Sequence, residues 1–291
     1  MSYRSIFRPT LFAGQTVIVT GGGSGIGRCT AHELASLGAA VALIGRKPEK
    51  LERVQAEIAQ VGGRASCHVC DIRDEPTVTA TITAILTEHG RIDGLVNNAG
   101  GQFPARARDL SLKGWEAVVK NNLTGGFLMA RECYTQWMEQ HGGTIVNIIA
   151  DIWGGMPTMA HSGAARAGML SFTESAACEW AHAGVRVNAV APGWIASSGF
   201  DTYSPEMQAG LHRLKHKVPL QRFGTESEIS AAIVFLLSEA AAFITGTCLR
   251  VDGGVPNARP TWQLIAHDKS KPFNGFHLAA LPKCLADAKE A

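Results

Sequence analysis

Charge of either sign is sparse in this sequence, and long apolar runs are missing. Asp, Glu, Lys and Arg make up 18% of the 291 residues, and the formal net charge at pH 7 is only +2. So small an imbalance does not suit a nucleic-acid or anionic-membrane surface as the main function of a protein. No apolar run reaches the length that crosses a bilayer, and residues 1–14 lack the apolar segment of a secretory signal. We therefore expect neither a membrane nor a nucleic-acid partner.

The cysteine pattern does not indicate a disulfide framework. The seven cysteines are scattered and odd in number, which fits a reducing cytosol better than a disulfide framework. The last residues, "ADAKEA", do not form a peroxisomal tripeptide, so we expect a cytoplasmic protein. Cys67 and Cys70 have a spacing seen in metal sites, but on a strand their side chains would face opposite sides. His212 and His216, one turn apart on a predicted helix, favour a solvated basic face, and no metal site is expected.

Apolar residues, in contrast, are plentiful at 46%, and they fall into short runs separated by helical patterns. Uninterrupted apolar runs between helices indicate a parallel sheet that is covered on both faces. Right-handed crossovers then predict an α/β fold with a doubly wound parallel sheet, the Rossmann fold. The predicted strands lie within residues 16–20, 40–45, 65–71, 92–100, 143–149, 185–193 and 248–254. Helical patterns follow the first strand as far as Leu37 and recur at 49–61, 75–90, 112–140, 160–183 and 225–238.

No linker rich in Pro, Gly or Ser divides the chain, so residues 1–255 are predicted to form a single domain. Residues about 194–222 interrupt the alternation of strands and helices. We expect them to form an insertion or lid after the sixth strand. Residues 256–291 have weak periodicity and are expected to form a C-terminal extension.

A glycine-rich string, "TGGGSGIG" at 20–27, joins the first predicted strand to the first helix. Glycines let the backbone turn sharply and approach a diphosphate, while the helix N-terminus supplies N–H donors and a partial positive charge. The string lies in the strand–turn–helix context that dinucleotide binding requires. We therefore expect cofactor contacts from Gly21, Gly23, Ser24, Gly25, Ile26 and Gly27.

The end of the second predicted strand indicates which dinucleotide is bound. An acidic residue there would hold a ribose 2′-hydroxyl, but this chain has Gly45, Arg46 and Lys47. A guanidinium and an ammonium suit a 2′-phosphate, which favours NADP(H) as the cofactor. The alternative is that both are ordinary solvated charges at the start of a helix.

Three further strand ends complete the predicted cofactor edge. Asp71, followed by Ile72, ends the third strand, where its carboxylate is placed to accept a hydrogen bond from an adenine amine or to cap a turn. Small residues follow the fourth strand and a Pro-Gly turn follows the sixth, and both allow close contact with a cofactor. The additional expected contacts are Asn98, Ala99, Gly100, Pro192, Gly193 and Ile195.

Together these motifs resemble the short-chain dehydrogenase/reductase superfamily. The matching strings are "TGGGSGIG", "NNAG" at 97–100, "NNLTGGF" at 121–127, "APG" at 191–193 and "VDGG" at 251–254, in that family's order and spacing. A narrower set, "NNAGGQF", "KGW", "HGGTIVNII", "HSGAARAG" and "FITG", is most similar to trans-2-enoyl-CoA reductases of peroxisomal type. The resemblance implies nicotinamide binding, oxidoreductase activity and a homo-oligomer, a tetramer or dimer formed through the helices at about 112–140 and 160–183.

In that superfamily an Asn, a Ser and a Tyr-x-x-x-Lys pair carry the reaction. Asn122 matches the Asn, and the Ser position falls near Ala150, with Asp151 beside it. The Tyr-x-x-x-Lys pair aligns with Ser162 and Arg166. The resemblance thus implies a catalytic set of Asn122, Asp151, Ser162 and Arg166, in which both members of the usual pair are replaced.

The replaced pair restricts the chemistry. Arg166 keeps a cation and donors for a nicotinamide ribose, but a pKa above about 12 prevents it from passing a proton. Ser162 is a far weaker acid than tyrosine, whose pKa is about 10. Reduction of an α,β-unsaturated thioester tolerates this loss, because aimed donors such as Ser162, or a water held by Asn122, stabilise the enolate without giving up a proton. Water or Asp151 would protonate the α carbon. Ser162 as a small packing residue and Asp151 as a loop cap remain open alternatives.

We therefore expect an NADPH-dependent oxidoreductase that transfers hydride to an enoyl thioester, with acyl-CoA as its small-molecule partner. Four basic residues of the predicted lid could meet CoA phosphates: Arg213, Lys215, Lys217 and Arg222. One alternative is an NAD(P)-dependent alcohol or ketone dehydrogenase of acyl or terpenoid compounds. Another is a catalytically silent dinucleotide-binding protein, because a fold does not prove activity.

Overall fold

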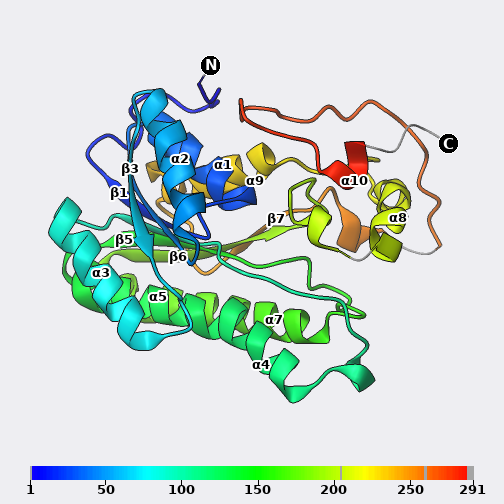
Figure 1. Ribbon diagram of the computed structural model, residues 1–291, viewed down its shortest axis with the longest axis horizontal. Coiled ribbons are helices and arrows are strands. Elements are labelled where there is room, and N and C mark those ends of the chain that lie inside the picture. The colour runs from blue at the N-terminus through cyan, green and yellow to red at the C-terminus, as the bar shows by residue number, and fades with distance from the viewer. Residues whose placement is uncertain (1, 204, 259–260, 287–291) are drawn as a thin grey trace.

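The computed structural model describes residues 2–203, 205–258 and 261–286. Its centre is one sheet of seven parallel strands in the order β3-β2-β1-β4-β5-β6-β7 (Figure 1). The predicted single-domain, doubly wound parallel fold is confirmed. The strands are β1 (Thr16–Thr20), β2 (Ala40–Gly45), β3 (Arg64–Val69), β4 (Gly94–Asn97), β5 (Gly143–Ile148), β6 (Val185–Pro192) and β7 (Cys248–Val251).

The strand order reverses next to β1. The chain builds outward from β1 through β2 to β3 and then returns to place β4 on the other side of β1. In open parallel sheets a crevice opens at the carboxyl ends of the strands where the order reverses. The carboxyl ends of β1 and β4 therefore mark the expected ligand position.

Helices cover both faces of the sheet (Figure 1). The predicted helix at 112–140 is one continuous run in which π-helical turns at Lys120–Thr124 and Tyr134–Met138 separate three α-helical pieces. One face carries α1 (Gly25–Ser36), α2 (Pro48–Gln60) and α9 (Glu226–Leu237). The other carries α3 (Glu75–His89), α4 (Leu112–Val119), α5 (Gly125–Cys133), α6 (Glu139–His141) and α7 (Ala160–Glu179).

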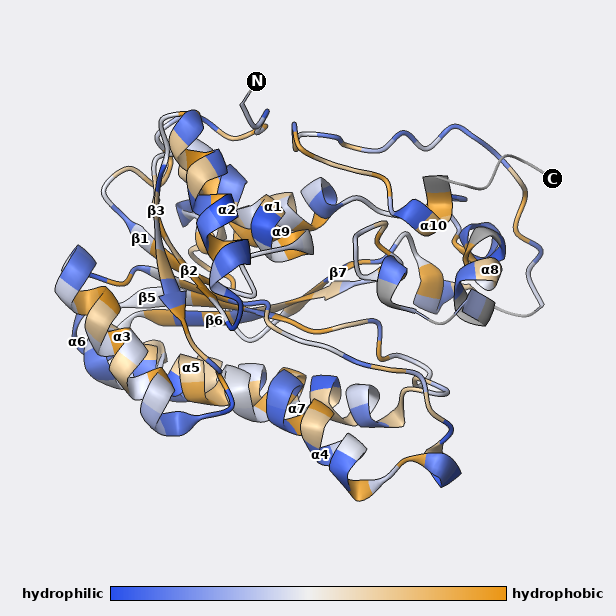
Figure 2. Cartoon of the chain, viewed as in Figure 1, coloured by the Kyte–Doolittle hydropathy of each residue, from blue (hydrophilic) through white to orange (hydrophobic). Residues whose placement is uncertain are grey.

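The core follows from the apolar runs. All five residues of β1 are buried, and Leu43 and Ile44 of β2 are fully buried. Burial of one such side chain contributes about 1.5–3 kcal/mol. Figure 2 shows apolar residues along the central strands and a mixture of apolar and polar residues around the surface helices. The result is a rigid sheet that fixes the loops at its carboxyl edge.

The prediction that the side chains of Cys67 and Cys70 face opposite sides of the sheet is confirmed. Cys67 packs with the cluster under α1 and α2, and its thiol donates to Gln55 Oε1 at 3.4 Å. Cys70 is buried in the cluster on the opposite face. None of the seven cysteines forms a disulfide within the described residues. Within the described ranges, no helix is both long and apolar enough to span a membrane.

Two segments lie outside the alternating pattern. The segment between β6 and α9 contains α8 (Pro205–Leu214), and the segment after β7 has little regular structure before α10 (Lys283–Ala286), which lies beside α8 (Figure 1). The C-terminal segment returns to the body of the protein. Phe276 packs with Tyr3 and Cys29, and its backbone N–H donates to Ser227 Oγ at 3.0 Å.

Candidate active site

The glycine-rich turn after β1 is shaped for close approach of a ligand. Gly21 and Gly25 have positive φ angles of 66° and 56°, which favour glycine. A Cβ on Gly27 would overlap the Gly21 carbonyl oxygen and the Asn98 side chain. Ser24 is the N-cap of α1 but makes no side-chain capping bond, and no acidic residue lies in the first turn. The first N–H groups of α1 are therefore not capped by the Ser24 side chain, which is the arrangement found at helix N-termini that bind phosphates.

The ends of β1 and β4 are joined by hydrogen bonds. Thr20 Oγ1 accepts from the backbone N–H groups of Asn98 and Ala99, both at 2.9 Å. The Asn98 side-chain amide donates to the Thr20 carbonyl at 2.9 Å. These bonds hold the "NNAG" turn beside the glycine-rich turn.

A group of cations surrounds the end of β3. Asp71 accepts from Arg73 Nε at 2.8 Å and from Arg73 Nη2 at 2.5 Å. The hydrogen bonds from Arg73, with Arg46 also contributing, lower the pKa of Asp71. Arg46 and Lys47 are exposed, and none of the ion pairs among the described residues involves them. Ile72 is buried against Gly125, where a Cβ would overlap its side chain.

Asn122 lies in the π-helical turn between α4 and α5. Its side chain is buried and binds Gly101 twice, accepting from the backbone N–H and donating to the carbonyl, each at 2.9 Å. Such turns often occur at functional sites because they redirect one side chain out of a helix. Asn122 therefore holds the loop after β4 in place.

Arg166 is a cation without an anionic partner in the described part of the chain. Its Nη1 donates to the Ile148 carbonyl at 2.5 Å, while its buried Nε has no hydrogen-bond partner there. A Cβ on Gly100 would overlap the guanidinium. Burial lowers the pKa of Arg166 to about 10, so the side chain remains charged at pH 7. An unpaired donor beside a glycine suits the hydroxyl groups of a bound ribose.

Ser162 is fully buried and is not free to face a substrate. Its hydroxyl donates to Gln102 Oε1 at 2.7 Å. This bond occupies the amide oxygen of Gln102, so the exposed side chain presents its NH2 group as the available donor. The sequence analysis expected Ser162, or a water on Asn122, to donate to the enolate oxygen. The structure adds the Gln102 amide, which is bonded to Ser162.

Asp151 follows β5 and lies near Asp252, which follows β7. One Asp151 carboxylate oxygen is buried without a partner among the described residues. Burial, and next the charge of Asp252, raise the pKa of Asp151. A carboxyl group with a raised pKa near a site is suited to deliver a proton.

Of the contacts predicted at the end of β6, Ile195 lines a cavity. Pro192 ends the strand, and Gly193 lies so close to Asp252 that a Cβ would overlap it. Ile195 lines a cavity of about 610 Å³, together with Trp194 and residues of the segment before α9 and of the end of β7. Of the basic residues predicted to meet phosphates, Arg222 is held by Glu228 through bonds of 2.7 and 2.9 Å.

Three residues of the site were missed by the sequence analysis. Gln102 is one of them. It is identified by its hydrogen bond with Ser162, 60 positions away, which only the structure reveals. His161 is fully buried, packs edge-on against Phe103 at 4.7 Å between ring centroids, and has no partner on either ring nitrogen within the described residues. Glu226, at the start of α9, places a carboxylate oxygen 3.9 Å from a Cβ built on Gly25. Burial raises the pKa of Glu226 to about 7.

Comparisons with known proteins agree with this geometry. A sequence profile described as "Enoyl-(Acyl carrier protein) reductase" matches residues 21–256. A probable 2,4-dienoyl-CoA reductase of Bacillus subtilis is 39% identical over 243 residues, which are 82% of this chain and 96% of that protein.

Two solved structures are similar throughout. The citronellol catabolism dehydrogenase AtuB of Pseudomonas aeruginosa is 58% identical, with a TM-score of 0.80 over 87% of this chain and all of that one. An actinorhodin polyketide ketoreductase solved with NADPH is 30% identical, with a TM-score of 0.79 over 86% of this chain and all of that one. The chain therefore belongs to the short-chain dehydrogenase/reductase family of NAD(P)-dependent oxidoreductases.

Proposed function

We propose that this protein is an NADPH-dependent reductase of conjugated acyl thioesters, with acyl-CoA as the substrate class. The observation that carries the proposal is the pair Ser162 and Arg166. It replaces a phenol and a lysine with a buried hydroxyl bonded to Gln102 and an unpaired cation. Such a site binds developing negative charge but lacks the acid that reduction of a carbonyl to an alcohol needs.

The residues present fit a nicotinamide dinucleotide. The glycine-rich turn is packed so tightly that a Cβ on Gly27 would overlap the Gly21 carbonyl oxygen, and Arg166 Nε lacks a partner among the described residues. Arg166 would hold the nicotinamide ribose, and Arg46 and Lys47 would hold a 2′-phosphate. When bound, NADPH supplies the hydride.

Gln102 would stabilise the thioester oxygen as it gains enolate charge. Its amide is oriented by Ser162, and the loop that carries it is held by Asn122. A preoriented donor requires no reorganisation as charge develops, and one such donor contributes about 10²–10³-fold to a rate. In this arrangement Ser162 and Asn122 position the donor.

Asp151 would then protonate the substrate carbon, directly or through water. Its raised pKa favours the protonated form that this role requires. The thioester oxygen therefore needs only hydrogen bonds, because the proton goes to carbon rather than to oxygen.

A second candidate rests on the structure that is 58% identical. The printed name of that protein, a citronellol catabolism dehydrogenase, favours a branched terpenoid substrate. A dehydrogenase of a terpenoid alcohol is therefore the alternative function. A branched acyl thioester would unite the two candidates.

We also propose that the chain assembles with itself. Apolar side chains are exposed along α4 and α5: Leu112, Trp115 and Phe127. These elements were predicted from the sequence to form the interface of a homo-oligomer.

Steady-state assays distinguish these functions. We expect NADPH oxidation with trans-2-enoyl-CoA or 2,4-dienoyl-CoA, and a value of kcat/KM at least about tenfold lower with 3-oxoacyl-CoA of equal chain length. Turnover of the ketone alone would contradict the proposal. Oxidation of citronellol with NADP⁺, without turnover of the thioesters, would support the second candidate. Tight NADPH binding without turnover of any compound would indicate a catalytically silent dinucleotide-binding protein.

A further inference from the structure

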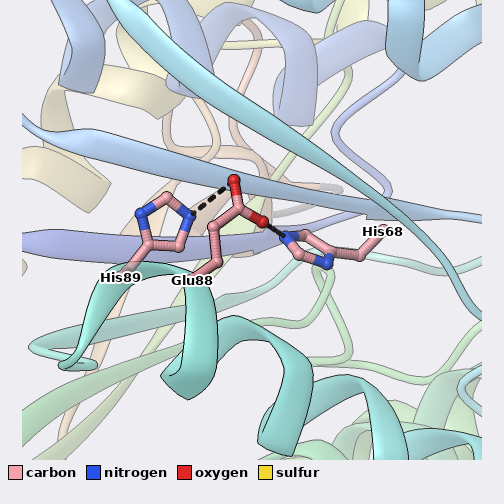
Figure 3. Close-up of side chains that lie close together, drawn as sticks. All are labelled: His68, Glu88 and His89. Atoms are coloured by element: carbon pink, nitrogen blue, oxygen red, sulfur yellow. Dashed lines mark ion pairs between the residues drawn. The ribbon is translucent and has the colours of Figure 1, made fainter.

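Three side chains of metal-ligating types lie close together outside the candidate active site. His68 lies on β3, and Glu88 and His89 end α3. Figure 3 shows the Glu88 carboxylate between the two imidazole rings. His68 Nε2 is 3.6 Å from Glu88 Oε2, and His89 Nε2 is 3.8 Å from Glu88 Oε1. All three donor groups lie within 4.8 Å of one another.

These distances are close to those of a tetrahedral zinc site. Bonds of about 2.0–2.1 Å to nitrogen and oxygen place neighbouring ligand atoms about 3.3–3.4 Å apart. The observed nitrogen–oxygen separations of 3.6 and 3.8 Å exceed that spacing by a few tenths of an ångström. Small rotations of the side chains would therefore close the three ligands around one ion.

The cluster is sheltered but accessible. The side chains of His68 and His89 are 10% and 15% exposed, whereas that of Glu88 is 52% exposed. An ion would reach the rings past the carboxylate, and a water could complete the coordination on the open side. Two neutral imidazoles and one carboxylate favour zinc over magnesium or calcium, which prefer sites built only from oxygen.

Ser66 supplies the competing explanation. Its hydroxyl lies 2.8 Å from the Nε2 atoms of both His68 and His89. One hydroxyl can accept from one ring and donate to the other, so the cluster is satisfied as a purely structural bridge. A bound ion would take the Nε2 lone pairs away from that bridge, and the serine would rotate to another rotamer.

We propose that His68, Glu88 and His89 form a zinc site that ties the outer strand of the sheet to the end of α3. The chain leaves β3 at Val69 and reaches Asp71 two residues later, so the ion would brace the strand that precedes a predicted cofactor contact. No sequence motif predicts this site, because the second ligand lies 20 positions after the first. The proposal does not depend on the reaction that the protein catalyses.

Calorimetric titration of Zn²⁺ into the chelator-treated full chain tests the proposal. We expect one equivalent to bind to the wild type and the melting temperature to rise. Glu88→Gln and His89→Ala should each lose more affinity than the about 10–100-fold typical of second-shell substitutions. His182→Ala, which removes an exposed histidine elsewhere, serves as the matched control and should bind like the wild type.

The Ser66→Ala variant distinguishes a zinc site from a hydrogen-bonded bridge through Ser66. The zinc site predicts that this variant keeps its affinity within about tenfold, because the hydroxyl is not a required ligand. With Co²⁺, the wild type should show the intense visible bands of tetrahedral coordination, and His89→Ala should not. Failure of the wild type to bind one equivalent would overturn the proposal. Equal binding by the wild type and His89→Ala would also overturn it.

Discussion

The residues at β1 and α1 match the family motif, whereas those on α7 differ from it. On the side of β1 and α1, Gly21, Gly25 and Gly27 have the backbone shape that a diphosphate requires. On the side of α7 lie Ser162 and Arg166, which the sequence resemblance aligns with the family's tyrosine and lysine. Backbone N–H groups and glycines bind through shape, which depends little on the reaction. Side chains that transfer protons depend on the reaction closely, and we therefore propose that α7 carries the residues that set the reaction.

Substitution of Arg166 is expected to have the largest effect on activity. Arg166→Met should lower kcat/KM by about 10²–10³-fold, because it removes donors aimed at the cofactor. The variant should keep or raise the melting temperature, since it removes a partly buried cation that lacks an anionic partner among the described residues. Stopped-flow kinetics and thermal unfolding measure the two effects. Arg166→Lys, which retains the charge, is the matched control and should keep most of the activity. Unchanged kinetics in Arg166→Met would place the cofactor elsewhere.

Gln102 gives the next largest effect. Gln102→Ala should lower kcat by about 10²-fold, because it removes the donor to the developing oxyanion. Ser162→Ala should cost less, since Gln102 keeps its donor but loses the bond that orients it. Measurement of kcat and KM for both variants decides the order. A larger loss in Ser162→Ala than in Gln102→Ala would show that the hydroxyl itself contacts the substrate.

Substitution of Arg46 and Lys47 tests the cofactor side of the site. Replacing both with Ala should lower the affinity for NADPH about 10–100-fold, because hydrogen bonds to charged groups contribute about 1.5–3 kcal/mol. The affinity for NADH should change little, so fluorescence titration with both cofactors isolates the 2′-phosphate. An equal loss for both cofactors would mean that the two cations do not distinguish them.

Glu226 gives the smallest effect and carries a pH signature. Its pKa is raised to about 7 in the folded chain from an ordinary value of 4.5, so the folded state holds the proton more tightly. Stability is therefore lost as the pH rises from about 4.5 to 7. Glu226→Gln should stabilise the fold by on the order of 1–3 kcal/mol at pH 8 and little at pH 4.5. It should also tighten NADPH binding a few-fold at pH 8, by removing a negative charge beside Gly25.

Denaturant unfolding at the two pH values checks this prediction. Glu116→Gln, at an exposed position on α4, is the control and should show no such pH dependence. A stabilisation of Glu226→Gln that is equal at both pH values would contradict the assigned role of the buried carboxyl.

The fold was predictable because its signals are local. The apolar run of β1, the glycines after it and the cations after β2 all lie within residues 16–47. Gln102 was not predictable, because its orientation depends on a bond to Ser162 that only the folded chain forms. Glu226 approaches the glycine-rich turn from 200 positions further along the chain. Polar contacts between distant segments leave no periodic pattern in a single sequence.

The most direct test of the account is a crystal structure of the chain with NADP⁺ and a conjugated acyl-CoA. We predict the Arg166 guanidinium on the hydroxyls of the nicotinamide ribose and the Gln102 NH2 group facing the thioester oxygen. A guanidinium turned away from the ribose, or a substrate oxygen bound by neither Gln102 nor a water on Asn122, would contradict it.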